Sequence, residues 1–266
     1  MKHALVLIAC LACPAWASAL APDAVQKVQS AQVVIVGEIH DNPDHHALQA
    51  ELAAQMTPSA IVFEMLTDDQ AARVTPAVRS SESTLNEVLE WDQSGWPDFA
   101  MYYPIFAAAP EARIFGAQVP RDKARATMEN GIESAFGPEA ARFGLTEDLP
   151  QDEQAAREAH QLAAHCDALP EDLLPDMVAI QRLRDAELAQ AAVIALEQTG
   201  GPVLVITGNG HAREDWGMPV YLERVRPDAR VVTIGQSEDG VAPPGIFDLV
   251  LDAPSVERGD PCEAFR

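Results

Sequence analysis

The sequence predicts an α/β fold in which helices flank a mainly parallel central sheet. Six short apolar runs recur along the chain, and such unbroken runs are typical of strands buried on both faces of a parallel sheet. Helical patterns separate the first five runs, as the crossover connections between parallel strands require. Four of the runs end on polar or ionisable residues, where ligands bind in this fold class. The runs are residues 33–36, 60–63, 113–117, 203–206, 230–234 and 247–251.

The first run shows the pattern most clearly. Val33 to Val36 are four consecutive aliphatic residues, and Gly37 lets the chain turn where a Cβ would obstruct it. Glu38 and His40 therefore leave the strand at its carboxyl end. Taken alone, this stretch is more typical of an ordinary strand-to-helix loop, so its significance depends on the strands that follow.

A helix is predicted directly after this loop. Asn42 or Asp41 fits the N-cap position, with Pro43 in the first turn. Adjacent side chains on a helix point in different directions. We therefore expect His45 to face the site and His46 to lie on the surface.

Residues 121 to about 199 show helical patterns only and predict a helical cap inserted between the third and fourth strands. The last of these helices runs from Pro175 to about Gln198. Its apolar stripe includes Gln181, Arg184 and Asp185, which predicts either a buried hydrogen-bond network or a wall of the site. No second domain boundary is evident, so residues 20–266 are predicted to form one domain.

Residues 1–19 have the features of a secretory signal peptide. Lys2 supplies a charged start, Leu5 to Cys13 an apolar core, and residues 17–19 an A-x-A cleavage site. Cys10 ends a stretch similar to a lipoprotein box, but the apolar run before it is short. No other segment approaches the ~20 apolar residues of a membrane helix. We therefore expect a protein exported to the periplasm, without a transmembrane segment and without anchoring at Cys10.

The formal net charge of −23 becomes −24 once Lys2 is removed with the leader. Such a surface repels nucleic acid and anionic lipid, so an anionic ligand needs a locally basic pocket. Two cysteines, Cys166 and Cys262, remain in the mature chain. In an oxidising compartment they can pair, and we expect either a disulfide or two inert thiols.

An aromatic-rich segment precedes the third strand. Five aromatic residues fall within 13 positions of a chain that is 6% aromatic overall. Core packing accounts for some of them, and the neighbouring Gly and Pro also suit the wall of a ligand pocket. The five are Trp91, Trp96, Phe99, Tyr102 and Tyr103.

The polar residues that follow the strands are predicted to converge, because neighbouring parallel strands bring their carboxyl ends to one edge of the sheet. Two histidines and two glutamates suit a divalent metal, acid–base chemistry or hydrogen bonding to a ligand. The chain has no G-x-S-x-G, P-loop or H-E-x-x-H motif, and Gly208-x-Gly210 is too short for a dinucleotide fingerprint. The strand-end residues are Glu38, His40, Glu64, Gln118, Arg121, His211 and Arg213.

Three of these motifs together resemble the ChaN family of haem-binding proteins associated with iron uptake. They are Gly37-Glu38-Ile39-His40-Asp41, Phe63-Glu64 and Gly208-Asn209-Gly210-His211. The wider superfamily includes the Tiki metalloproteases, TraB proteins and erythromycin esterases. The resemblance extends over most of the mature chain, including the aromatic segment up to Pro104, the turn at residues 119–121 and Gln181-x-x-x-Asp185.

The resemblance implies that haem binds through a tyrosine, with two haems stacked between the subunits of a homodimer. Tyr103 is the first choice for the iron ligand and Tyr102 the second, whereas Tyr221 is expected to be a packing residue. A phenolate is an established ligand of ferric haem. Arg121 and Arg213 would pair with propionates, although surface ion pairs are nearly as probable for them. His211 and Trp96 complete the predicted haem contacts.

A second hypothesis follows from the wider superfamily. It is a metal-dependent or acid–base hydrolase that uses Glu38, His40, Glu64 and His211, with His40, Glu64 and His211 as ligands of any divalent metal. A third is an interaction protein whose ancestral site is silent. Haem uptake by the purified protein separates the first hypothesis from the other two.

Overall fold

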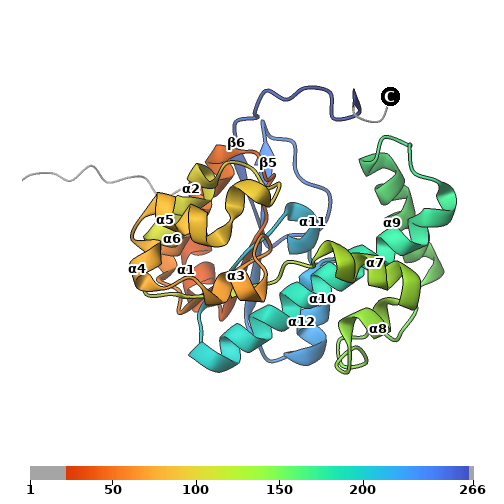
Figure 1. The fold of residues 1–266 in the computed structure, drawn as a ribbon, viewed down its shortest axis with the longest axis horizontal. Helices are drawn as coiled ribbons and strands as arrows, with labels where there is room; N and C mark the ends of the chain where they lie inside the picture. The colour runs from red at the N-terminus through yellow and green to blue at the C-terminus, as the bar shows by residue number, and fades with distance from the viewer. Residues whose placement is uncertain (1–21, 264–266) are drawn as a thin grey trace, which may run out of the picture.

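The central feature of the protein is a six-stranded sheet in which all strands are parallel (Figure 1). A computed structural model describes residues 22–263; the predicted signal peptide and Cys10 lie outside them. The strand order is β3-β2-β4-β1-β5-β6. This confirms the predicted α/β fold. The strands are β1 (Val33–Val36), β2 (Ala60–Phe63), β3 (Arg113–Gly116), β4 (Val203–Ile206), β5 (Val231–Glu238) and β6 (Leu249–Ala253).

The three most apolar strands lie side by side at the centre. Every residue of β1, β2 and β4 is buried, because helices cover both faces of the sheet. Side chains alternate between the faces. Val34 and Val36 enter one hydrophobic core, and Val33 and Ile35 enter the other. The alternation therefore makes two apolar layers from one β-branched run.

Helices from the first half of the chain lie together on one side of the sheet (Figure 1). In the core on this side, α2 packs closely against α6. The helices are α1 (Pro22–Ser30), α2 (Pro43–Met56), α3 (Asp68–Ala72), α4 (Pro76–Arg79), α5 (Glu82–Leu89), the 3₁₀ turn η1 (Trp91–Gln93) and α6 (Phe99–Ala108).

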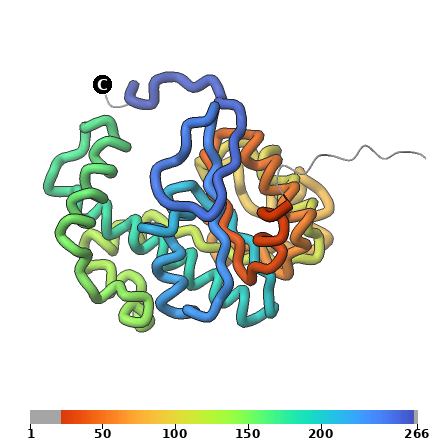
Figure 2. The backbone as a smooth tube through the Cα atoms, turned by 180° about the vertical axis from the view of Figure 1, so that it is seen from behind, coloured from red at the N-terminus to blue at the C-terminus, as the bar shows by residue number. Residues whose placement is uncertain are grey.

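The helices of the 121–199 insertion lie on the opposite side. The last of them, α10, is 26 residues long and packs against β2, β3 and β4, so it covers the sheet and also carries the outer helices (Figure 2). The later helices α11 (Asn209–Ala212) and α12 (Met218–Val225) follow β4. The insertion comprises α7 (Arg121–Asn130), α8 (Ile132–Phe136), α9 (Gln151–Ala164), the 3₁₀ turn η2 (Glu171–Leu173) and α10 (Leu174–Thr199).

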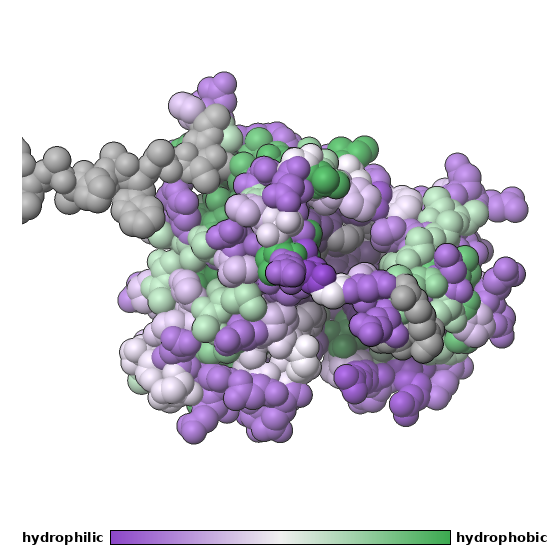
Figure 3. All heavy atoms as spheres, turned by 90° about the horizontal axis from the view of Figure 1, so that it is seen from above, coloured by the Kyte–Doolittle hydropathy of each residue, from purple (hydrophilic) through white to green (hydrophobic). Residues whose placement is uncertain are grey.

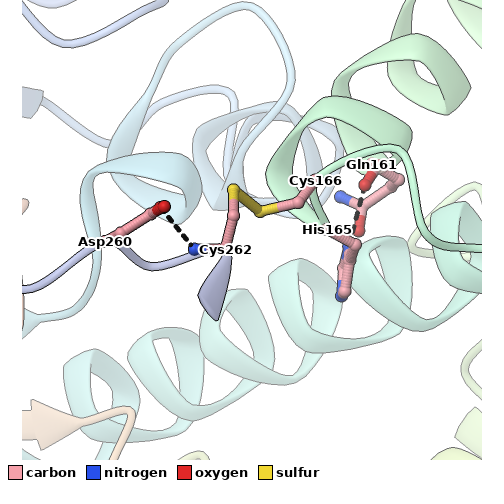
Figure 4. Close-up of a disulfide and its surroundings, with 5 residues drawn as sticks. All are labelled: Gln161, His165, Cys166, Asp260 and Cys262. Carbon is pink, nitrogen blue, oxygen red and sulfur yellow. Dashed lines mark hydrogen bonds between the residues drawn. A yellow bond between two sulfur atoms is a disulfide. The ribbon is translucent and has the colours of Figure 1, made fainter. Parts of the chain in front are cut away.

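The segment after β6 crosses back over the carboxyl edge of the sheet toward α9 (Figure 1). We call residues 254–262 the C-terminal strap. Its far end is fixed by a disulfide between Cys262 and Cys166, just beyond α9 (Figure 4). Within the described residues, no helix is long and apolar enough to cross a membrane.

Candidate functional site

The candidate site lies where β1, β2 and β4 end. Two positions there, 37 and 208, require glycine because a side chain would clash with a neighbouring residue. A Cβ on Gly37 would lie 2.3 Å from Oδ1 of Asn209, and one on Gly208 would lie 3.0 Å from Nε2 of His40. Both loops therefore pass close to neighbouring groups, and the strand-end side chains come together.

Glu38 holds His40 in place. The Glu38 side chain is fully buried, and its Oε1 lies 2.7 Å from Nδ1 of His40. Tyr102 donates its hydroxyl proton to the same oxygen at 2.7 Å, and Gln49 Nε2 donates to the other oxygen, also at 2.7 Å. With Nδ1 held by the carboxylate, the Nε2 atom of His40 is left facing Gly208. Such carboxylate–histidine pairs fix the orientation of an imidazole.

A second pair faces the first across Glu64. Nδ1 of His211 lies 2.7 Å from Oδ1 of Asp185 on α10, and Nε2 of His211 lies 3.7 Å from Oε1 of Glu64. The other oxygen of Glu64 accepts hydrogen bonds from the Thr207 hydroxyl and the Gly208 backbone N–H. The site is thus a central carboxylate between two imidazoles, each held by its own carboxylate.

These contacts favour the charged forms of His40, Glu64 and His211. Burial alone would lower the pKa of His40, but the hydrogen bond to Glu38 and the charge of Glu64 outweigh it and raise the pKa to about 9. Burial opposes ionisation of Glu64, yet the two histidines lower its pKa to about 2. The pKa of His211 is raised by Glu64 and Asp185 against the effect of burial. At neutral pH, Glu64 is therefore an anion beside the imidazolium ion of His40, and its charge favours the protonated form of His211.

The two histidines and Glu64 open onto a cavity of about 340 Å³. Trp96 lines it, with its ring centroid 5.0 Å from that of His40. Arg121, at the start of α7, and Arg184, on α10, also line it, and neither forms an ion pair with any described residue. The remaining lining residues are Ala117, Gln118, Val119, Gln181 and Leu188.

The two predicted tyrosines lie apart from this cavity. Tyr102 is fully buried, and burial together with the charge of Glu38 raises the pKa of its phenol well above the usual value, so it is a neutral hydrogen-bond donor. Tyr103 points to a different cavity of about 200 Å³, where its hydroxyl donates to the carbonyl of Arg79 at 3.3 Å. Tyr221 is buried in α12, as expected for a packing residue.

Arg213 lies on the other side of His211. It is 7% exposed, and its Nε and Nη2 atoms donate to the two carboxylate oxygens of Asp215. Its guanidinium carbon lies 3.9 Å from the ring centroid of Trp216. Arg213 therefore faces a separate, smaller cavity that shares His211 and Gln181 with the first.

The expectations for the two adjacent histidines of α2 are wrong. His45 does not face the cavity: its Nδ1 accepts from the Ile39 backbone N–H, and its Nε2 lies 3.2 Å from the Ser237 carbonyl. His46 is fully buried, not exposed, with Nε2 2.9 Å from the His40 carbonyl. His45 is enclosed between the loop after β1 and strand β5, and the His46 ring packs against Tyr102 of α6 with the ring centroids 4.2 Å apart.

The chain matches the family model described as haem-binding uptake, Tiki superfamily, ChaN over residues 24–222. The protein belongs to this family. Its fold is similar to that of ChaN of Campylobacter jejuni, a structure described as cofacial heme binding, with a TM-score of 0.61 and 19% identity over 82% of this chain and 86% of that one. The type III effector HopBA1 matches at a TM-score of 0.48 and 14% identity, covering 87% of this chain and 92% of that one. A search of curated proteins finds no match.

Several residues of this ChaN-type site do not follow from the strand pattern. Asp185 and Arg184 come from α10, and the stripe on that helix was the signal that pointed to them. Tyr102 as the partner of Glu38 carries no comparable signal, because its neighbours in the sequence are equally aromatic. Within residues 22–263, no group of three or more His, Cys, Asp or Glu side chains is arranged to hold a metal ion.

Proposed function

We propose that this protein is an exported haem-binding protein of haem or iron uptake, and that haem binds at the cavity between His40 and His211. Membership of the ChaN family over residues 24–222 carries the proposal. The signal peptide expected at residues 1–19 supports export, and cell fractionation of the tagged full-length chain tests it.

The chemistry of the cavity suits the ligand. Trp96, Val119 and Leu188 offer apolar surface for part of a porphyrin face, and apolar walls with a few placed polar groups are typical of cofactor sites. Arg121 and Arg184 have no acidic partner among the described residues and can pair with propionates. They supply the local positive charge that an anionic ligand needs on a chain of net charge −23.

His40 is the residue that we propose to face the iron, since its Nε2 atom is directed away from Glu38. A bound haem would supply a ferric iron that takes a nitrogen or oxygen ligand from the protein. His40 must lose a proton to take that role, so Glu38, which favours the charged ring, opposes ligation below pH 9. Tyr103, from the second cavity, is the alternative ligand.

Haem titration of three variants distinguishes these ligands. We expect His40→Ala to lose or shift the Soret band of the wild-type complex and Tyr103→Phe to leave it unchanged. His165→Ala, which removes a histidine just beyond α9 that lines none of these cavities, is the control. A Soret band that changes only in Tyr103→Phe places the haem at the second cavity. A wild-type protein that takes up no haemin refutes the proposed function.

Acid–base hydrolysis is a second candidate, favoured by the carboxylate between two oriented imidazoles. Residues poised in this way can exchange protons with a substrate. The substitution Glu64→Gln keeps the shape of the side chain and removes its charge. A hydrolase would lose its activity in this variant, whereas a haem-binding protein would retain most of its haem affinity.

A haem-dependent homodimer completes the proposal. Size-exclusion chromatography coupled to light scattering, with and without haemin, measures the mass directly. We expect the dimer to form only with haemin and to contain two haems. A monomeric complex with one haem would support haem binding and contradict the proposed dimer.

A further inference from the structure

A third cavity, of about 60 Å³, lies on the far side of His211 from the proposed haem site. We call it the arginine cavity. Arg157 and Gln161 of α9, Asp185 of α10, and Arg213 and Trp216 after α11 line it. Its size admits a few waters or one small polar group and excludes a sugar, a nucleotide or a porphyrin.

Two arginines in this cavity are more than nine-tenths buried, and each keeps one terminal nitrogen free. Arg157 uses Nε and Nη2 on Oε1 of Glu153, and Arg213 uses Nε and Nη2 on Asp215. Nη1 of each forms no hydrogen bond with a described residue, and neither Nη1 is sealed off by protein. Because both arginines line the cavity, these two groups are its candidate donors to a ligand.

Trp216 fixes the positions of both guanidinium groups. The guanidinium carbons of Arg213 and Arg157 lie 3.9 and 5.3 Å from its ring centroid. Cation–π contacts of this kind are stronger when the groups are buried. The donors are thus held in place before a ligand arrives, which lowers the entropy cost of binding.

The local charge is more favourable to an anion than that of the protein as a whole. Arg157 and Arg213 meet a single lining carboxylate, Asp185, whose pKa is raised by burial, and the pKa of His211 is raised by its acidic neighbours. Glu153 and Asp215 each pair with one arginine, so the formal charge of the site is close to zero on a chain of net charge −23.

We propose that the arginine cavity binds a carboxylate group, held by the Nη1 atoms of Arg157 and Arg213. The carboxylate has two possible sources: a small free carboxylate, or a propionate of a haem in the adjoining cavity, with which this one shares His211 and Gln181. Only the second source rests on the proposed function.

Acetate is the probe for the first source. The indole N–H signal of Trp216, followed by NMR in the mature chain without haem, should shift saturably with acetate. In Arg157→Gln the affinity should fall at least tenfold. Arg142→Gln, which removes an exposed arginine paired with Glu139, makes the same change in charge and should bind as wild type does.

A steric variant covers the case in which Arg157→Gln fails to fold. Gly210 lines the cavity, and a Cβ there meets no atom within 4 Å. Gly210→Leu should therefore fill the space, keep the fold and abolish the acetate shift. Equal acetate affinity in Gly210→Leu and wild type would overturn the proposed free-carboxylate site.

Haemin and its dimethyl ester, which has no free propionates, test the second source. If a propionate occupies the cavity, Arg157→Gln should weaken haemin binding at least tenfold and leave ester binding unchanged. Equal losses for both ligands, or none, exclude a propionate. If wild type binds no haemin, the proposed function fails and the acetate experiment alone decides the inference. The inference is overturned if Arg157→Gln changes neither the affinity for acetate nor the affinity for haemin.

Discussion

At the residue scale, the buried carboxylate of Glu38 determines how the site is built. Four side chains from three parts of the chain surround it: His40 from the loop after β1, His46 and Gln49 from α2, and Tyr102 from α6. A buried charge without such partners would cost several kcal/mol. The network therefore stabilises the fold and at the same time orients His40.

Removing the Tyr102 hydroxyl should destabilise the protein. Tyr102→Phe leaves Oε1 of Glu38 with one fewer donor, and losing a hydrogen bond to a buried charged group costs about 1–3 kcal/mol. Tyr103→Phe is the matched control, because its hydroxyl makes a 3.3 Å contact in a half-buried position. Urea unfolding of both variants gives the free energies. Equal stability of the two would show that the Glu38 contact is weak.

The pKa of His40 predicts a pH dependence of stability. The folded-state pKa of about 9 lies above the ordinary value of 6.5, so protonation of His40 stabilises the fold below pH 6.5. This contribution should be lost as the pH rises from 6.5 through 9. We expect His40→Gln to abolish that part of the pH dependence, and NMR titration of the His40 ring to give the pKa directly.

Glu38→Gln provides the internal check on that pH dependence. The substitution removes a nearby negative charge, so the pKa of His40 should fall. A His40 ring that titrates near pH 6.5 in the wild-type protein would contradict the assigned cause.

The sequence predicts the residues that directly follow strands well. Glu38, His40, Glu64 and His211 meet because parallel strands leave no alternative for their carboxyl ends. Whether a helical residue reaches the site depends on how the helix is rotated about its own axis and how closely it packs against the sheet. A single sequence does not define either. For this reason the burial of His46 and the contact of Tyr102 with Glu38 could not be predicted.

At the element scale, the predicted strands are present but differ in extent. The last one, β6, starts at Leu249 and not at residue 247, because Asp248 instead binds β5 through the backbone N–H of Thr233. The aromatic segment contains a helix, α6, with Pro104 in its interior, and no helix was predicted there from the sequence. Tertiary packing against α2 outweighs the local cost of that proline.

The N-cap of α2 predicts an unusually costly substitution. Asn42 is fully buried, and its Oδ1 accepts from the Asp44 backbone N–H while its Nδ2 donates to Glu238 and to the Pro254 carbonyl. An N-cap is worth about 1 kcal/mol on its own. Because the buried donors add to this, we expect Asn42→Ala to cost about 2–4 kcal/mol.

Ser81, the N-cap of α5, is the comparison for Asn42. Its side chain is half-buried and accepts a hydrogen bond from the Thr84 backbone N–H, without reaching across the fold. Ser81→Ala should cost about 1 kcal/mol in the same denaturation experiment. A similar cost for both caps would mean that the contacts of Asn42 to the strap contribute little.

At the scale of the whole molecule, the C-terminal strap ties the site loop to the helical insertion. Arg258 donates to both Asp41, next to His40, and Glu238, at the end of β5. Seen from above, hydrophilic and hydrophobic residues are interspersed on the surface, and the insertion forms a lobe beside the sheet (Figure 3). The strap therefore spans two parts of the fold that are far apart in sequence.

The disulfide at the end of the strap should contribute strongly to stability. Cys166 and Cys262 are 96 residues apart, and cross-linking so long a loop removes much of the conformational freedom of the unfolded chain. In the chain-entropy model this is worth up to ~4–5 kcal/mol, and typical measured values are about 2–4 kcal/mol. We expect the Cys166→Ala/Cys262→Ala double variant to lose about that amount in urea unfolding. A reducing agent should destabilise the wild-type protein to the same level and leave the double variant unchanged. If reduction affects both proteins equally, the disulfide is not the source of the loss.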